Sequence, residues 1–234
     1  MRQIVLDTET TGLSPSQGHR IIEIGCIEIA NRRLTGREFH RFINPERDID
    51  EGAQRVHGIS REDLEGQPLF SGVVDDLLDF IRDAELVIHN AEFDVGFLEH
   101  EMRLMKHPLP VITQHAMVLD TLALARKLHP GQRNSLDALC KRYSVDASQR
   151  DVHGALIDAE LLARVYLAMT GGQAALSLDA DLESVGGIDN ETVVRRRRDD
   201  LHFVVVQASD NEMSAHEAML DRLADSGACA WRKP

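Results

Sequence analysis

Two acidic residues at the end of a short apolar run are the first candidates for chemistry in this sequence. Asp7 and Glu9 follow residues 4–6, whose β-favouring apolar side chains predict a buried strand. Residues i and i+2 of a strand project from the same face, so the two carboxylates should point the same way. Because like charges held together repel unless a cation neutralises them, the pair indicates a site for a hard divalent ion.

Further candidates occur in two later segments of the chain. Asp94 comes just after the apolar run 86–88, in the first turn of a helix predicted over residues 91–105. Asp158 lies about one turn inside a helix predicted over residues 155–169, where a core-facing carboxylate is costly without a partner. His153 precedes that helix. Taken singly, Asp94 could simply favour the helix N-terminus, and His153 could be an ordinary surface histidine.

Together, an Asp-x-Glu pair, a later Asp and a final His-x4-Asp resemble the DEDDh family of 3′→5′ exonucleases, which have a ribonuclease H-like fold. Within the family, the chain is most similar to the proofreading subunits of bacterial DNA polymerase III. The likeness is dense over residues 2–172. It rests on Asp7-Thr8-Glu9-Thr10-Thr11-Gly12, Val56-His57-Gly58-Ile59, His89-Asn90-Ala91-Glu92-Phe93-Asp94, Arg133-Asn134-Ser135-Leu136-Asp137-Ala138-Leu139-Cys140 and His153-Gly154-Ala155-Leu156-Ile157-Asp158.

The resemblance implies a two-metal hydrolysis of the terminal phosphodiester. Asp7, Glu9, Asp94 and Asp158 are expected to hold two Mg²⁺ or Mn²⁺ ions about 3.5–4 Å apart. His153 is expected to act as general base, a task suited to an imidazole near neutral pH. The products would be nucleoside 5′-monophosphates and a shortened strand.

The residues expected to contact the terminal nucleotide are less closely fixed by the pattern. Besides the ligands Asp7, Glu9 and Asp158, the candidates are Thr10, His57 and Phe93. For Phe93 a place in the helix core is an equal alternative, and His57 would otherwise be read as a turn histidine. Residues 50–54 differ from the family pattern, so the nucleotide contact expected there is left open.

The remaining pattern predicts the elements that must position these residues. Strands over residues 20–30 and 34–43, joined by the polar turn 31–33, form an antiparallel meander with the first strand. Helices are predicted over residues 70–81, 120–128 and 134–143, the last capped by Asn134 or Ser135. The predicted fold is α/β, with a mixed five-stranded sheet flanked by helices on both sides.

Composition changes after Gly171-Gly172, which divides the chain into a domain (1–172), a flexible linker (173–200) and a C-terminal segment (201–234). The linker contains an arginine run, 195–198, which is either solvated or in contact with DNA or a partner. The C-terminal segment has a strongly apolar run, 203–206, and an amphipathic stretch, 214–224, but it is too short to bury this surface by itself. We therefore expect it to bind another protein, which in the resembled family is the catalytic alpha subunit of DNA polymerase III.

A short motif opens the linker. Gln173, Leu176 and Leu178 match the constrained positions of peptides by which replication proteins bind the sliding clamp. Three constrained positions in six residues also arise by chance. Its place in an accessible tail, directly after an exonuclease domain, favours clamp binding.

Charge and composition exclude several other classes. A net charge of −13 and 4% aromatic residues predict weak intrinsic affinity for DNA, so a partner is expected to deliver the 3′ end. No stretch approaches the ~20 apolar residues that span a bilayer, and the chain starts directly on a strand instead of a signal peptide. Three widely separated cysteines form neither a disulfide framework nor a zinc pattern, which predicts a cytoplasmic protein.

Two alternatives remain at this point. A stand-alone DEDDh exoribonuclease would share every catalytic residue but would not need the apolar tail or the clamp-like peptide. A mainly structural connector between polymerase and clamp would need no nuclease, yet all four acids and His153 are present in the chain.

Overall fold

The computed structural model describes residues 2–148, 152–171, 208–226 and 231. These residues belong to two parts, the domain formed by residues 2–171 and a C-terminal helix with Trp231, and each part is described by itself. Within the described residues, no helix is both long enough and apolar enough to cross a membrane.

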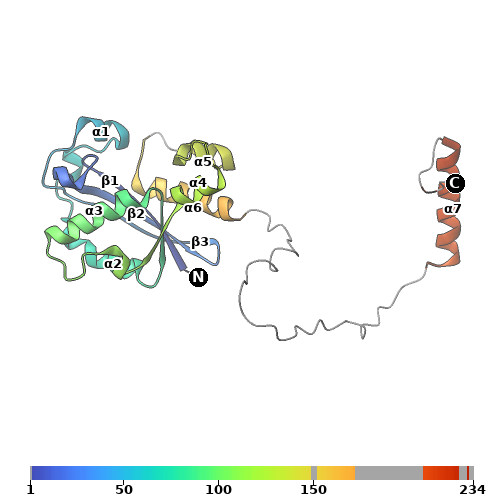
Figure 1. The fold of residues 1–234 in the computed structure, drawn as a ribbon, viewed down its shortest axis with the longest axis horizontal. Coiled ribbons are helices and arrows are strands. Elements are labelled where there is room, and N and C mark those ends of the chain that lie inside the picture. Colours follow the sequence, from blue (N-terminus) through green and yellow to red (C-terminus); the bar gives the residue numbers. More distant parts are fainter. Residues whose placement is uncertain (1, 149–151, 172–207, 227–230, 232–234) are drawn as a thin grey trace, which may run out of the picture. The chain divides into compact units, whose positions relative to one another are not determined.

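The domain is built on one mixed sheet with the strand order β3-β2-β1-β4-β5 (Figure 1). The antiparallel part is formed by β1, β2 and β3, while β1, β4 and β5 run parallel. The predicted mixed five-stranded sheet and its meander are confirmed. The strands span Arg2–Thr10 (β1), Ile21–Ala30 (β2), Arg33–Phe42 (β3), Glu85–Ile88 (β4) and Met117–Asp120 (β5).

No sequence pattern predicts β5. This strand has only four residues, and its last residue, Asp120, is also the N-cap of the helix that follows. Asp120 Oδ1 accepts the backbone N–H groups of Leu122 and Ala123 at 2.7 and 3.2 Å. Because a strand this short passes directly into a helix, its pattern is hidden by the capping signal.

Six α-helices belong to the domain within the described residues. Five have bounds slightly different from the predicted ones, and the helix Glu51–His57 was not predicted. The predicted helix 70–81 is a short 3₁₀ turn followed by α2, because Ser71 and Gly72 are poor helix formers. The cap of α5 is Ser135, whose hydroxyl accepts the Ala138 N–H. The helices span Glu51–His57 (α1), Val74–Ile81 (α2), Ala91–Leu104 (α3), Thr121–Leu128 (α4), Leu136–Tyr143 (α5) and Ala155–Thr170 (α6).

The helices cover both faces of the sheet. On one face, Leu6 of β1 belongs to a core with Leu77 of α2 and Phe97 of α3. On the other face, Val5 belongs to a core with Leu162 of α6 and with residues of α4 and α5. Side chains alternate along a strand, so Asp7 and Glu9 share the face of Val5, toward α6, while Thr8 faces α3. This alternation decides which helix each functional side chain of β1 can meet.

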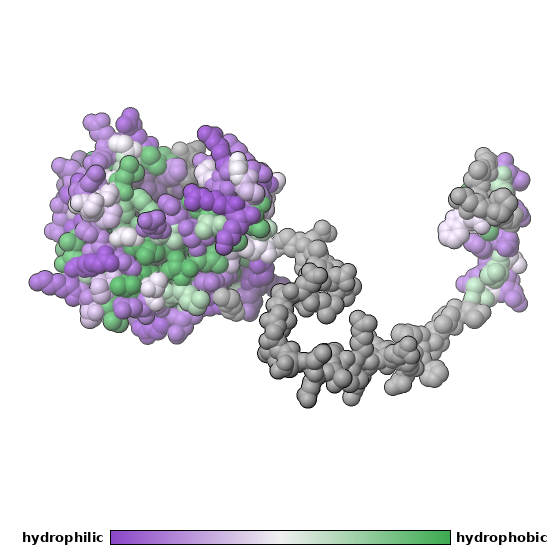
Figure 2. Space-filling view, in the orientation of Figure 1, coloured by the Kyte–Doolittle hydropathy of each residue, from purple (hydrophilic) through white to green (hydrophobic). Residues whose placement is uncertain are grey.

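The C-terminal part contains α7, Asp210–Ser226. It includes residues 214–224, the stretch predicted to be amphipathic, and extends beyond that stretch in both directions. Met213, Met219 and Leu223 are exposed on this helix, as is Trp231 beyond it, and Figure 2 shows hydrophobic and hydrophilic residues side by side on α7. The linker, the candidate clamp peptide, the arginine run and residues 201–207 lie outside the described residues.

Candidate active site

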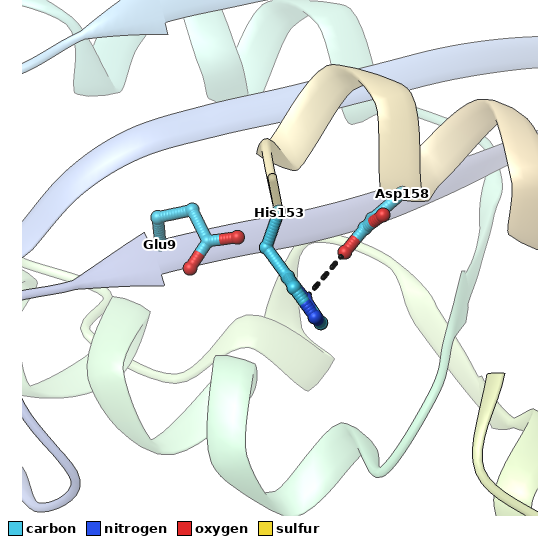
Figure 3. A group of neighbouring side chains, drawn as sticks. All are labelled: Glu9, His153 and Asp158. Carbon is cyan, nitrogen blue, oxygen red and sulfur yellow. Dashed lines mark ion pairs between the residues drawn. The ribbon is translucent and has the colours of Figure 1, made fainter. Parts of the chain in front are cut away.

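Three predicted site residues meet where β1 ends and α6 begins. Glu9, His153 and Asp158 each offer a ligand atom within 4.8 Å of the others, and Nδ1 of His153 lies 3.2 Å from Oδ2 of Asp158. Figure 3 shows the Glu9 carboxylate facing His153, which stands just before the helix that carries Asp158. The predicted convergence of β1 and α6 is therefore observed, across a sequence separation of more than 140 residues.

Asp7 lies on β1, two residues before Glu9, on the same face of the strand. It is opposite Gly25 in the β1–β2 pairing, while Glu9 is opposite Glu23. Its side chain is half-buried, and it is not a member of the group formed by Glu9, His153 and Asp158. The face of β1 next to α6 thus presents two carboxylates, as the spacing predicts.

Asp94 lies in the first turn of α3, directly after β4, and is 3% exposed. Its Oδ1 accepts a hydrogen bond from the Thr8 hydroxyl at 2.7 Å, so it meets β1 from the α3 side of the sheet. Burial raises the pKa of Asp94 to about 7; the bond from Thr8 acts against the rise and the neighbouring Asp120 carboxylate adds to it. A carboxylate in this setting gains from a nearby cation.

A cavity of about 450 Å³ opens beside Glu9. It lies between the end of β1, the loop after it, helix α1 and the first turn of α3. Its lining residues are Thr8, Glu9, Thr10, Gly12, Leu13, Asp50, Gly52, Ala53, Val56, His57 and Phe93. Of the six residues predicted to contact the terminal nucleotide, Glu9, Thr10, His57 and Phe93 line this cavity, whereas Asp7 and Asp158 do not.

Thr10, His57 and Phe93 have different environments. Thr10 is buried and its hydroxyl donates to the Gly12 carbonyl at 2.7 Å, so its side chain holds the loop. His57 is buried and its Nδ1 accepts the Ile59 N–H at 3.0 Å, which leaves Nε2 to carry the proton of the neutral ring. Burial lowers the pKa of His57, and the nearby His153 lowers it further. The hydrogen bond with the Thr10 backbone raises the pKa and so opposes this shift. Phe93 fits both alternatives, nucleotide contact and core packing. It lines the cavity, and its ring also packs on Phe97 with 4.9 Å between the ring centroids.

Comparison with known proteins identifies the class of enzyme to which this site belongs. A sequence model described as "Exonuclease" matches residues 4–166. The DNA polymerase III subunit epsilon of Salmonella typhimurium is 51% identical over 236 residues, covering 99% of this chain and 97% of that protein. The chain belongs to the epsilon family of exonucleases. The Escherichia coli epsilon subunit is 50% identical with the same coverage.

The fold of the domain agrees with this membership. Exonuclease X in complex with 5′ overhanging duplex DNA is similar with a TM-score of 0.56 and 23% identity, over 73% of this chain and 92% of that chain. The resemblance to the DEDDh exonucleases and the prediction of a proofreading exonuclease subunit are both confirmed by this epsilon family membership. A complex of E. coli ExoI with single-stranded DNA, which is similar in fold with a TM-score of 0.62 and 16% identity over 74% of this chain and 41% of that chain, is a zinc-bound form.

The side chains at the site fit divalent ions. Glu9 and Asp158 each bring a carboxylate oxygen to one group, Asp7 lies on the same face of β1 as Glu9, and hard divalent cations prefer oxygen ligands. The buried Asp94, with its raised pKa, lies at the same strand end through its bond to Thr8. A bound cation would offset the repulsion between carboxylates held this close together.

Several cavity residues were not among the predicted contacts. Leu13 is 86% exposed, yet it lines the cavity and a second hollow next to Phe93. Gly12 lines the cavity too, and a Cβ there would lie 2.3 Å from the ring of the buried His19, so a larger residue would force that ring to move. Asp50, Gly52 and Ala53 line the cavity from the stretch 50–54 that the family pattern leaves open, and Val56 lines it from the motif that follows. A single leucine in a loop carries no periodic signal, so only the folded chain reveals its place.

Proposed function

We propose that this chain removes misincorporated nucleotides from the 3′ end of a DNA primer, as the proofreading subunit of a bacterial DNA polymerase III. One observation carries the proposal: Glu9, His153 and Asp158 meet beside a cavity large enough for a terminal nucleotide. That meeting occurs in a chain that aligns over nearly its whole length with epsilon subunits. Each cleavage releases a nucleoside 5′-monophosphate.

Asp7, Glu9, Asp94 and Asp158 would hold two divalent ions, Mg²⁺ or Mn²⁺. When bound, such ions lower the pKa of a water and stabilise the oxygen that departs from the scissile phosphodiester. The protein's own contribution is to present oxygen ligands from both faces of β1, Asp7 and Glu9 from one side and the Thr8-bound Asp94 from the other.

His153 removes the proton from the attacking water. Its ring stands outside the helix, 43% exposed, and its Nδ1 lies against the Asp158 carboxylate, which orients the imidazole. The terminal nucleotide would occupy the cavity, where the Nε2–H of His57 can donate to it and the Phe93 ring can stack on its base. Thr10 holds the loop that brings backbone groups to the nucleotide.

The test is the relative rate on DNA and RNA. The chain should remove a mismatched 3′ nucleotide from a DNA primer at least about 10-fold faster than it degrades RNA of the same sequence, a difference of about 1.4 kcal/mol in transition-state free energy. Equal or faster RNA degradation would favour the stand-alone exoribonuclease. Absence of hydrolysis on both substrates, with Mg²⁺ and Mn²⁺ supplied, would favour the structural connector.

Two partner contacts complete the proposal for a cytoplasmic replication protein. Residues 201–234 would bind the catalytic alpha subunit, since α7 exposes Met213, Met219 and Leu223, and residues 173–178 would bind the sliding clamp. Deleting residues 201–234 should abolish co-purification with alpha while leaving hydrolysis of single-stranded DNA unchanged.

The Gln173→Ala/Leu176→Ala variant should lose clamp binding and keep alpha binding. Unchanged binding in either variant would reject the corresponding contact.

A further inference from the structure

A buried carboxylate next to the proposed active site has no role in the mechanism given above. Glu23, on β2, is 4% exposed and lies opposite Glu9 in the β1–β2 pairing. Paired residues of neighbouring strands project from the same face, so Glu23 points to the α6 side, as Glu9 does. It is nevertheless not a member of the group formed by Glu9, His153 and Asp158. A carboxylate this buried needs specific partners to offset its desolvation.

Each oxygen of Glu23 has a different partner. Oε1 lies 2.7 Å from Nε2 of His40 on β3, and Oε2 accepts the backbone N–H of Ala155 at 3.1 Å. Ala155 is the first residue of α6, and the first N–H groups of a helix have no partner within the helix. The N-cap, Gly154, has no side chain that could serve them. Glu23 therefore supplies from β2 the cap that the helix lacks in its own sequence.

A second feature of β2 holds the same turn of α6. Gly25 lies opposite Asp7, and a Cβ added to Gly25 would lie 2.3 Å from the carbonyl carbon of Ala155 and from the nitrogen of Leu156. The start of α6 thus rests directly on the backbone of β2. The backbone N–H of His153 also donates to the Val56 carbonyl at 3.1 Å. Together these contacts fix the position of the first turn of α6 relative to β2 and α1.

The fixed turn carries the chemistry. His153 precedes Ala155 by two residues, and Asp158 follows it by three, with its N–H bonded to the Gly154 carbonyl at 2.8 Å. We propose that Glu23 is a positioning residue for hydrolysis: by holding the Ala155 N–H, it sets His153 and Asp158 against Glu9. The inference rests on the proposed function and assigns no contact between Glu23 and metal or substrate. A displacement of about 1 Å at the reacting groups can lower a rate by about 10²-fold.

The test compares Glu23→Ala with His40→Ala. Glu23→Ala should lower kcat on a single-stranded oligonucleotide by about 10- to 100-fold with little change in KM, because the cavity walls come mainly from other elements. His40→Ala is the matched control: it removes the other partner of Glu23 and keeps the Ala155 bond, and water can replace the partly exposed imidazole. Its kcat should stay near that of the wild-type chain.

Two further readouts separate positioning from general destabilisation. Glu23→Gln keeps an oxygen acceptor for Ala155 and should restore most of kcat. Hydrogen exchange at the Ala155 amide, measured by NMR, should be fast in Glu23→Ala and slow in Glu23→Gln and His40→Ala. If Glu23→Ala does not fold, Glu23→Met, which fills a similar volume without the carboxylate, replaces it in each measurement.

The outcomes also distinguish this inference from the proposed function. If the Glu23→Ala variant has the wild-type kcat while a separate His153→Ala variant is inactive, the positioning role is overturned and the proposed function stands. Equal losses in Glu23→Ala and Glu23→Gln, with the Ala155 amide protected in both, would also overturn it. A wild-type chain without nuclease activity would instead reject the proposed function itself.

Discussion

A variant in which Asp7 and Glu9 are both replaced by alanine is expected to hydrolyse DNA at least about 10³-fold more slowly than the wild-type chain. The two carboxylates lie on one face of β1, and Glu9 meets His153 and Asp158 directly. Removing both leaves no carboxylate ligand for a divalent ion on that strand. Activity should be measured on a 3′-labelled oligonucleotide with saturating Mn²⁺, so that a modest loss of metal affinity alone cannot account for the result.

The same change should leave the fold intact. Both side chains are half-buried at the end of the strand, whereas the packing of β1 comes from Ile4, Val5 and Leu6, which are fully buried. Each alanine lowers the stability of the strand by less than about 1 kcal/mol through its weaker β-propensity. Part of this loss is offset because the repulsion between the two carboxylates disappears. Thermal unfolding followed by circular dichroism should therefore show a similar midpoint in both proteins.

A matched control exists on α2. Asp75 and Asp76 are exposed in its first turn, so the Asp75→Ala/Asp76→Ala variant changes net charge by the same amount away from the site. It should retain wild-type activity. The single variants Asp7→Ala and Glu9→Ala should each lose nearly as much as the double variant, because ligands of one metal site act as a unit. Near-wild-type activity in the double variant would contradict the assignment of the site.

Local sequence patterns predict the parts of this site that depend on one element at a time. The i, i+2 spacing places Asp7 and Glu9 on one face, and the apolar run before Asp94 places it at a strand end. Both hold because strand alternation and helix periodicity are local properties of the chain. The position of His153 before α6 follows similarly from Gly154, which the structure has as the N-cap of that helix.

The remaining features depend on contacts between segments that no local pattern connects. Gly25 reads in sequence as an unexceptional strand glycine, and only the approach of Ala155 to its backbone explains it. Glu23 reads as a polar residue on an apolar strand, and its role appears only when β3 and α6 both reach it. Leu13 likewise acquires its meaning from the cavity beside it. These are tertiary properties, so periodicity carries no trace of them.

The second large effect is expected at Asp94, where activity and stability should change in opposite directions. Asp94→Asn should lower hydrolysis by about 10³-fold, since an amide supplies no charge to hold a cation. The same variant should be more stable than the wild-type chain in metal-free buffer near pH 8. The asparagine oxygen can still accept the Thr8 hydroxyl, and a buried amide carries no charge to desolvate.

The pH dependence follows from the direction of the shift. The pKa of Asp94 rises from 3.8 to about 7 on folding, so its contribution to stability is fully present below pH 3.8 and is lost as the pH rises through about 7. The unfolding midpoint of the wild-type chain in EDTA should therefore fall, relative to Asp94→Asn, between about pH 4 and about pH 7, and the difference should level off above that. Adding Mn²⁺ should raise the wild-type midpoint most at the higher pH, because the bound cation favours the ionised carboxylate.

Glu92→Gln is the control for this experiment. It removes the same charge from the same turn of α3, but at an exposed position. Its unfolding midpoint should follow that of the wild-type chain across the pH range. Parallel curves for the wild-type chain and Asp94→Asn would show that the buried carboxylate imposes no such cost. If the two unfolding midpoints differ at high pH in EDTA and become similar when Mn²⁺ is added, the ionised Asp94 destabilises the metal-free chain and the bound cation removes that cost. The chain would then retain a destabilising carboxylate because its function requires it.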